Sequence, residues 1–123
     1  MATILLVEDE QLMRDVIRES LELEGHRVLE APNGQAALDV LSRWLGPVDV
    51  LVTDVVMPVM GGAELMRQVR HRQPGLPVVL ISGWPITNRA SIDELTLFLQ
   101  KPVTYGQLSR AVHRSLTRPV RAL

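Results

Sequence analysis

The sequence lacks cysteine altogether, which excludes disulfide bonds and thiolate metal sites and is compatible with a reducing compartment. Aromatic residues make up only 3% of the chain, so the core must be built from aliphatic side chains. A net charge of -1 and the absence of a basic cluster with interleaved aromatics argue against nucleic acid as a direct partner. The first apolar run ends at Glu8, too early for a signal peptide or a membrane span, so we expect a cytoplasmic protein without membrane association.

Lysine is nearly absent as well. Lys101 is the only lysine among 13 basic residues, and the others are arginines. An arginine-biased composition explains those arginines, but it does not explain why the one exception precedes Pro102 at the end of an apolar run. A lysine there offers a compact point charge on a flexible stem, which the planar fork of arginine does not.

The chain of 123 residues, 46% hydrophobic and 22% charged, is typical of one globular domain. Runs of Val, Ile and Leu alternate with segments of helical periodicity. The runs predict strands that end at residues 7, 31, 54, 82 and 100, and the periodic segments predict helices over 11–23, about 34–45, about 62–72, 89–95 and 104–116. We expect the core of the domain to cover about residues 3–116 and a polar tail to follow over 117–123.

The short connections between these strands and helices predict the architecture. Such crossovers are right-handed and give a parallel sheet covered by helices on both faces. Runs that are apolar throughout fit strands buried on both sides. The sequence therefore predicts an α/β fold with a doubly wound, five-stranded parallel sheet. Thr104 and Gln107 have the spacing of a capping box at the start of the last helix.

Four of the apolar runs stop at polar side chains: Glu8-Asp9, Asp54, Ser82 and Lys101. In open α/β sheets, ligands bind outside the carboxyl ends of the strands. If the strands are neighbours, three carboxylates, a hydroxyl and an ammonium meet in one cleft. The adjacent pair poses a geometric problem, because consecutive residues of a regular strand point to opposite faces; at a strand end, both can turn into the cleft.

The carboxylates predict a site for a divalent cation. Either residue of the Glu8-Asp9 pair alone is more simply explained as a helix N-cap or a solvated loop residue. Asp54, however, ends a strongly apolar run, and its repulsion with Asp9 would be relieved by a cation. Mg²⁺ prefers a few carboxylate and carbonyl oxygens together with retained waters. The histidines are scattered singly and give no support for zinc.

Ser82 and Lys101 supply the opposite polarity. A hydroxyl donor and an ammonium that face a metal-bound carboxylate suit a tetrahedral anion with its charge shared among three oxygens. Gly83 has no side chain and would let such an anion approach the backbone.

With these residues in place, the chain resembles the receiver domain of two-component response regulators. The resemblance rests on Glu8-Asp9, the stretch Thr53–Pro58 with Gly62, Ser82-Gly83 and the stretch Phe98–Pro102. It extends from Thr3 to about Leu116 and implies a flavodoxin-like sheet with strand order 2-1-3-4-5. It also implies a signalling switch that is phosphorylated by a histidine kinase or a histidine phosphotransfer domain and that is not an enzyme with turnover of its own.

The resemblance assigns roles to individual residues. Asp54 would be the phosphoacceptor, and Ser82 and Lys101 would hold phosphoryl oxygens. Mg²⁺ would be bound by Glu8 (through water), by Asp9 and Asp54, and by the main-chain carbonyl of Val56. The resemblance further implies a cis peptide bond before Pro102.

Ser82 and Phe98 would act as the switch, with the Phe98 rotamer reporting phosphorylation. An equally good reading of Phe98 is a core aromatic with no switching role. Val56 and Trp84, together with Gly83, would flank the phosphoryl group. Because Val56 and Trp84 are apolar, we expect them to exclude the hydrolytic water and to prolong the phosphorylated state; the alternative is that Trp84 only covers apolar surface beside the cleft.

The segment between Ser82 and Lys101 is shorter than in most receivers, so the helix over 89–95 should be abbreviated or irregular. In this family, the face made by that helix, the strand 96–100 and the last helix commonly mediates output or self-association. Self-association through this face is therefore left open here. The sequence also does not distinguish a stand-alone regulator, a phosphorelay intermediate and a receiver that is part of a longer kinase or regulator.

Three other classes fit less well. A phosphohydrolase of the haloacid-dehalogenase type uses a second Asp two residues after its nucleophile, and that position is Val56. A Rossmann nucleotide-binding domain would need a glycine-rich loop where the sequence has Glu8-Asp9-Glu10. A receiver-like domain that binds partners without phosphorylation would not need the complete set of site residues.

Overall fold

The computed structural model describes residues 1–83 and 94–117. In this part of the chain, strands and helices alternate as the sequence predicts, except that no helix is described between β4 and β5. The elements are β1 (Thr3–Val7), α1 (Gln11–Leu23), β2 (Arg27–Ala31), α2 (Gly34–Arg43), β3 (Val50–Asp54), α3 (Gly62–Arg72), β4 (Val78–Ser82), β5 (Thr96–Gln100) and α4 (Tyr105–Thr117). The helix predicted over 89–95 falls almost entirely within residues 84–93, which lie outside the described residues, as does Trp84.

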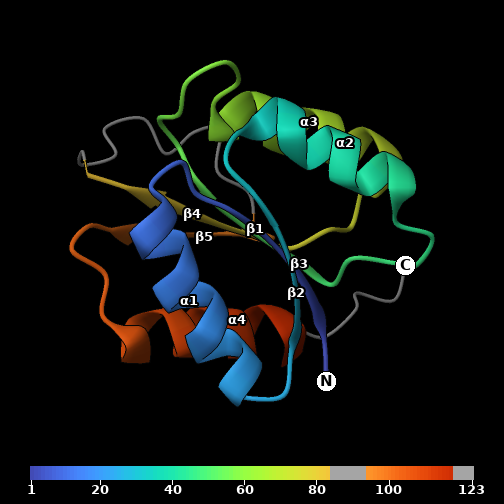
Figure 1. Cartoon of the computed structure of the whole chain (residues 1–123). Coiled ribbons are helices and arrows are strands. Elements are labelled where there is room, and N and C mark those ends of the chain that lie inside the picture. Colours follow the sequence, from blue (N-terminus) through green and yellow to red (C-terminus); the bar gives the residue numbers. More distant parts are fainter. Residues whose placement is uncertain (84–93, 118–123) are drawn as a thin grey trace.

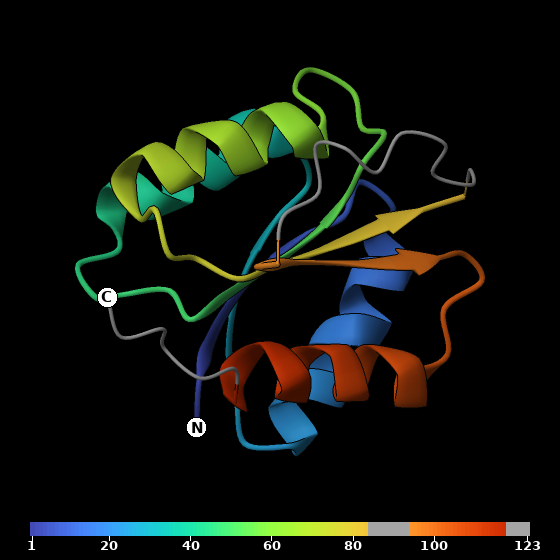
Figure 2. The same ribbon diagram turned by 180° about the vertical axis from the view of Figure 1, so that it is seen from behind.

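The five strands form one parallel sheet in the order β2-β1-β3-β4-β5, which confirms the predicted topology. Helices α2 and α3 cover one face of the sheet, and α1 and α4 cover the other (Figures 1 and 2). The fold is thus doubly wound, and the carboxyl ends of all five strands lie at the same edge of the sheet. None of the helices in the described ranges is long and apolar enough to cross a membrane.

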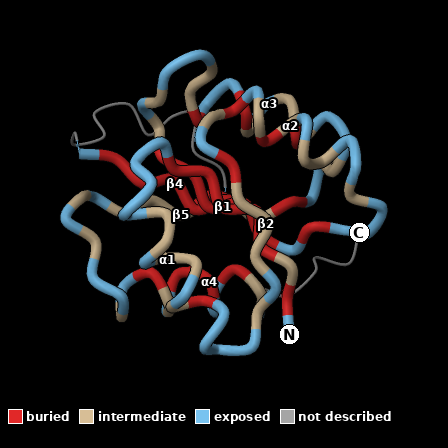
Figure 3. The backbone as a smooth tube through the Cα atoms, viewed as in Figure 1, coloured by how far each residue is buried: buried red, intermediate tan, exposed pale blue. Residues whose placement is uncertain are grey.

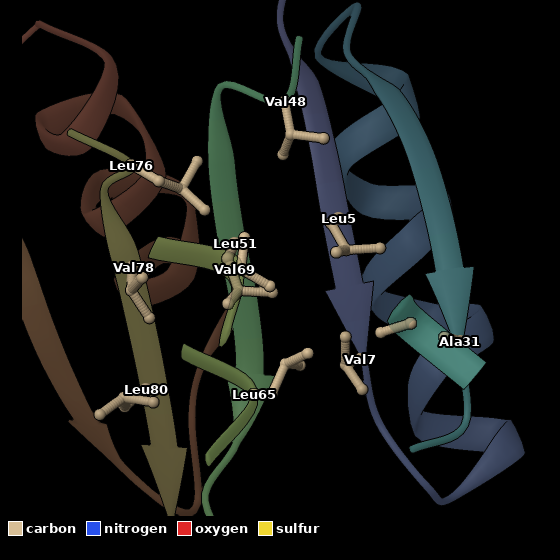
Figure 4. Packing of buried hydrophobic residues seen from close by; sticks show 11 residues of the cluster. Leu5, Val7, Ala31, Val48, Leu51, Leu65, Val69, Leu76, Val78 and Leu80 are labelled. Atoms are coloured by element: carbon tan, nitrogen blue, oxygen red, sulfur yellow. The ribbon is translucent and has the colours of Figure 1, made fainter. Parts of the chain in front are cut away.

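The core consists of two aliphatic layers, one on each face of the sheet. Figure 3 shows the burial along the backbone, with the central strands coloured as buried. Along β1, Leu5 and Val7 pack toward α2 and α3, whereas Ile4 and Leu6 pack toward α1 and α4. Figure 4 shows the first layer, in which Leu5 lies among side chains of the neighbouring strands. This double burial explains why the apolar runs are continuous rather than alternating. All residues of β3 and β4 are buried, whereas the outer strands β2 and β5 are only partly buried.

Helix α4 begins as its sequence predicts. The Thr104 amide donates to Gln107 Oε1 (2.9 Å), and the Gln107 amide donates to Thr104 Oγ1 (3.1 Å). These reciprocal bonds satisfy two amide groups at the start of the helix and form the capping box. They fix where the chain turns into α4 shortly after Lys101.

Gly62, the first residue of α3, lies against the end of β3. A Cβ atom at this position would be 2.1 Å from the main-chain oxygen of Asp54. The Gly62 amide also donates to the Val55 carbonyl at 2.9 Å. The absence of a side chain therefore allows α3 to start directly on the strand end that carries Asp54.

We predict that Gly62→Ala lowers the free energy of unfolding by at least ~2 kcal/mol, because the added methyl meets rigid backbone. Urea unfolding followed by circular dichroism measures the effect. Gly75→Ala is the matched control, since a Cβ at Gly75 has no neighbour within 4 Å; it should be neutral or stabilise by about 0.5 kcal/mol. Equal effects of the two substitutions would contradict the packing argument.

Candidate functional site

The predicted site residues follow the carboxyl ends of adjacent strands. Asp54 ends β3 and Ser82 ends β4, with Asp54 in register with Ile81 on the neighbouring strand. Glu8 and Asp9 follow β1, which pairs with the other side of β3. The order of the sheet therefore puts Asp54 between the acidic pair and Ser82, as the sequence led us to expect.

The three carboxylates form a compact cluster. Glu8, Asp9 and Asp54 each offer an oxygen, and these oxygens all lie within 4.8 Å of one another. Glu8 and Asp54 are buried, with 2% and 4% of their surfaces exposed, whereas Asp9 is exposed. Both members of the adjacent pair thus turn into the cleft, since β1 ends at Val7 and Glu8 has left the regular strand.

Lys101 contacts two of these carboxylates. Its Nζ lies 3.2 Å from Asp54 Oδ1 and 3.6 Å from Glu8 Oε1. The Lys101 amide donates to the Ser82 carbonyl (2.7 Å), and the Lys101–Pro102 peptide bond is cis, as predicted. Burial alone would lower the pKa of Lys101, but the charges of and hydrogen bonds to Asp54 and then Glu8 raise it, so the side chain is an ammonium.

Glu8 has the most perturbed acidity in the cleft. Burial, its hydrogen bond with Asp54 and the negative charge of Asp54 raise the pKa of Glu8 from 4.5 to about 8, although Lys101 acts in the opposite direction. When no further cation is bound, Glu8 therefore holds its proton at pH values at which an isolated glutamic acid has lost it.

The donor set fits a hard divalent cation. Within the described residues, Glu8 Oε2 and Asp54 Oδ2 are buried and have no hydrogen-bond partner. A buried anionic oxygen without a partner is unfavourable, and a metal ion satisfies it. Carboxylate oxygens with an exposed third ligand, Asp9, suit Mg²⁺, which keeps several waters.

The remaining predicted residues lie around this cluster. Ser82 is buried beside the end of β3, and Gly83 is exposed, with open space where a Cβ would be. Val56 lies in the loop after β3 with 67% of its surface exposed. Phe98 is half-buried on β5 and packs against the core layer under α2 and α3. A switching role for Phe98 stays a prediction.

Sequence reasoning missed Arg14. Its Nη1 donates to the main-chain oxygen of Glu8 at 2.8 Å, and its side chain is only 14% exposed. The available signal was a cation in the first turn of the helix that follows the acidic pair, a place where the helix dipole disfavours positive charge.

The loop between β3 and α3 contains a strained turn. Val59 has a φ of 72° and is the one non-glycine residue with positive φ in the described ranges. The Met60 amide donates to the Pro58 carbonyl (2.8 Å), which closes a γ-turn around Val59. A β-branched residue is unfavourable in this backbone conformation, and the Val59 side chain is 81% exposed, so packing does not compensate.

We predict that Val59→Gly raises the free energy of unfolding by up to ~1 kcal/mol, because glycine adopts positive φ without strain. The control is Val56→Gly in the same loop, which should lower stability by roughly 0.5–1 kcal/mol because it only adds freedom to the unfolded chain. Urea unfolding of both variants is the measurement. A loss of stability in Val59→Gly would show that the turn is not strained.

A second prediction concerns pH. Folded Glu8 keeps its proton up to about pH 8, whereas in the unfolded chain it loses the proton near pH 4.5. The stabilisation that results from this difference in pKa is fully present below pH 4.5 and is lost as pH rises through about 8. Without metal, the free energy of unfolding should therefore fall with pH in this interval, by up to ~1.4 kcal/mol per pH unit from this group.

Urea unfolding in the presence of a chelator, at a series of pH values across this interval, measures the slope. Glu8→Gln should flatten it, because the amide does not titrate. Glu10→Gln is the matched control: Glu10 is exposed and caps α1 without a side-chain hydrogen bond, so the slope should stay as in the native chain. A native slope retained in Glu8→Gln would contradict the prediction.

Comparison with known proteins agrees with this geometry. The family model described as "Response regulator receiver domain" matches residues 4–113. The sensor kinase CckA of Brucella abortus is 36% identical over 120 residues, covering 95% of this chain and 13% of the kinase. A response regulator receiver protein from Sinorhizobium medicae is 30% identical with a TM-score of 0.85, covering 95% of each chain. The regulator TrrA from Thermotoga maritima, solved in complex with Mg²⁺-BeF, is 26% identical with a TM-score of 0.79, covering 94% of this chain and 100% of that one.

The chain spans only part of the first curated relatives, between 13% and 52% of their lengths. What it shares with them is one module, which accounts for nearly all of its own sequence. The chain therefore belongs to the response regulator receiver domain family of two-component signalling.

Proposed function

We propose that this receiver domain is phosphorylated on Asp54 by a histidine kinase or a histidine phosphotransfer domain, with Mg²⁺ bound by Glu8, Asp9, Asp54 and the main-chain carbonyl of Val56. The observation that supports this most is the environment of Asp54. One of its oxygens is ion-paired with Lys101, and the other is buried beside Glu8 without a hydrogen-bond partner.

The chemistry follows from these positions. A carboxylate oxygen of Asp54 attacks the phosphorus of a phosphohistidine; the new P–O bond forms as the P–N bond breaks, and the imidazole keeps the electron pair and takes up a proton. A bound Mg²⁺ supplies positive charge for the phosphoryl oxygens. Lys101 neutralises the charge that the phosphoryl group brings, and the Ser82 hydroxyl, at the end of the adjacent strand, donates a hydrogen bond to it.

The pairing of β4 with β5 makes Ser82 and Phe98 candidates for the switch. Leu80 and Phe98 are in register on β4 and β5, as are Ser82 and Gln100. A shift of Ser82 toward the phosphoryl group would therefore pull on the strand that carries Phe98. The half-buried position of Phe98 leaves its side chain partly free to respond.

A partner that phosphorylates Asp54 must cover the surface around the cleft. That surface carries exposed apolar side chains: Leu12 (76%) and Val16 (60%) on α1, and Val56 and Val59 on the loop after β3. Between α1 and α4 runs a groove of about 420 Å³, which reaches the cleft and is lined largely by apolar residues. Exposed apolar surface beside a reactive group supports docking of another protein.

We further propose that the domain takes up one phosphoryl group and is not a phosphatase with turnover. Turnover needs a general acid or base beside the acyl phosphate. Val56, two residues after Asp54, has no titratable group, and its side chain points to solvent.

Intact-mass measurement after incubation with Mg²⁺ and acetyl phosphate tests the proposal. We predict a gain of one phosphoryl group by the native chain, no gain with a chelator, and no gain by Asp54→Asn. The matched control is Asp39→Asn, which removes an exposed carboxylate on α2 and should leave phosphorylation unchanged. A native chain that is not modified would identify a phosphorylation-independent binding module, and continuous phosphate release would identify a hydrolase.

A further inference from the structure

The acidic pair needs an explanation that the strand alone does not give. Glu8 and Asp9 follow Val7, the last residue of β1, so the alternation of a regular strand no longer fixes where their side chains point, yet both contribute an oxygen to the carboxylate cluster. The main chain at Glu8 must therefore be held in an orientation that turns both side chains the same way. Crowding three carboxyl groups into one cluster opposes such an arrangement.

Two contacts hold the main chain of Glu8. Its amide donates to the Ala31 carbonyl of β2 at 3.1 Å, which continues the pairing of β1 with β2 by one residue. Its carbonyl accepts from Arg14 Nη1 at 2.8 Å. Arg14 lies in the first turn of α1, and helical side chains point back toward the N-terminus, so its guanidinium reaches across the turn to Glu8.

Arg14 is itself held from β2. Its Nε donates to Glu30 Oε1 at 3.2 Å, and Glu30 Oε2 is ion-paired with Arg18 Nε at 2.8 Å. The guanidinium thus bridges Glu30 and Glu8 with two of its nitrogens, which a lysine ammonium does not reproduce. With 14% of its side chain exposed, Arg14 is also less exposed than Glu30 (34%) and Arg18 (28%).

The position of Arg14 has no evident benefit for the helix. A positive charge in the first turn opposes the helix dipole, and α1 has no acidic residue in that turn and no side-chain cap. What this placement gains is the pair of contacts with Glu8 and Glu30.

We propose that Arg14 is a positioning residue for the metal site: by fixing the Glu8 carbonyl, it orients the carboxylates of Glu8 and Asp9 for one divalent cation. Glu30 orients Arg14, and Arg18 completes the network without contacting Glu8. This inference rests on the metal-binding part of the proposed function and does not depend on phosphorylation of Asp54.

Electrostatics and positioning predict opposite results when the Arg14 charge is removed. Arg14→Met takes a cation away from the vicinity of three carboxylates, which by charge alone would strengthen Mg²⁺ binding. If Arg14 positions the ligands, the same variant binds Mg²⁺ more weakly, by about tenfold, as is typical when a partner of a metal ligand is lost. Calorimetric titration with Mg²⁺ alone, without a phosphodonor, measures the affinity.

Three further variants complete the experiment. Arg18→Met is the matched control, since it removes a charge from the same network but no contact with Glu8; its Mg²⁺ affinity should stay within about twofold of native. Arg14→Lys keeps the charge and Glu30→Ala keeps Arg14 but removes the acceptor of its Nε, and each should weaken binding severalfold because the bridge is broken. If Arg14→Met does not fold, these two variants still test whether Arg14 positions the metal ligands.

Urea unfolding of each variant separates positioning from a purely structural role. Unchanged or tighter Mg²⁺ binding by folded Arg14→Lys and Glu30→Ala would overturn the inference, whatever their stability. If the native chain itself binds no Mg²⁺, the metal-binding part of the proposed function fails as well. If the native chain and the Arg14 variants bind equally, only the inference about Arg14 fails.

Discussion

Excess negative charge in a small buried volume is the constraint on which the rest of this structure depends. Glu8 and Asp54 are buried next to each other with the exposed Asp9 beside them, and one ammonium, that of Lys101, faces all of this charge. Such an arrangement is unfavourable on its own, so the surrounding structure must hold it in place. The two aliphatic layers supply the needed stability, since they fix β1 and β3, the two paired strands whose ends carry the carboxylates.

The loops at this edge of the sheet reflect the same constraint. Gly62 lets α3 start against the carbonyl of Asp54, and the turn at Val59 accepts an unfavourable backbone conformation in the connection between them. On the other side, Arg14 occupies a helix position that the dipole disfavours. Near the carboxylates, Val59 and Arg14 thus occupy a backbone conformation and a helix position that their residue types disfavour. The capping box of α4, by contrast, has the residues that helix starts favour.

Apolar runs and their polar stops are local patterns, and they were sufficient to predict the five strands and the helices α1, α2, α3 and α4. The strand order that brings four strand ends together in the cleft came from the resemblance to receiver domains. The strand over 96–100 and the helix start after Thr104 were predicted from such patterns alone. The contact of Arg14 with Glu8 and the positive φ of Val59 were not predictable in this way. The first depends on how a helix is set against a strand, and the second on a turn geometry that valine rarely adopts. Neither leaves a periodic signal.

The position of the single lysine has a chemical consequence. In a chain with one lysine side chain, any reagent or enzyme that modifies lysine side chains acts at the cleft or not at all. Lys101 is 39% exposed at its side chain, so its amine is reachable, and acylation would remove the only ammonium that faces the carboxylates. Arginine provides every other basic side chain of the molecule and is insensitive to such chemistry. All lysine chemistry of this chain is therefore confined to one amine, which lies beside Asp54.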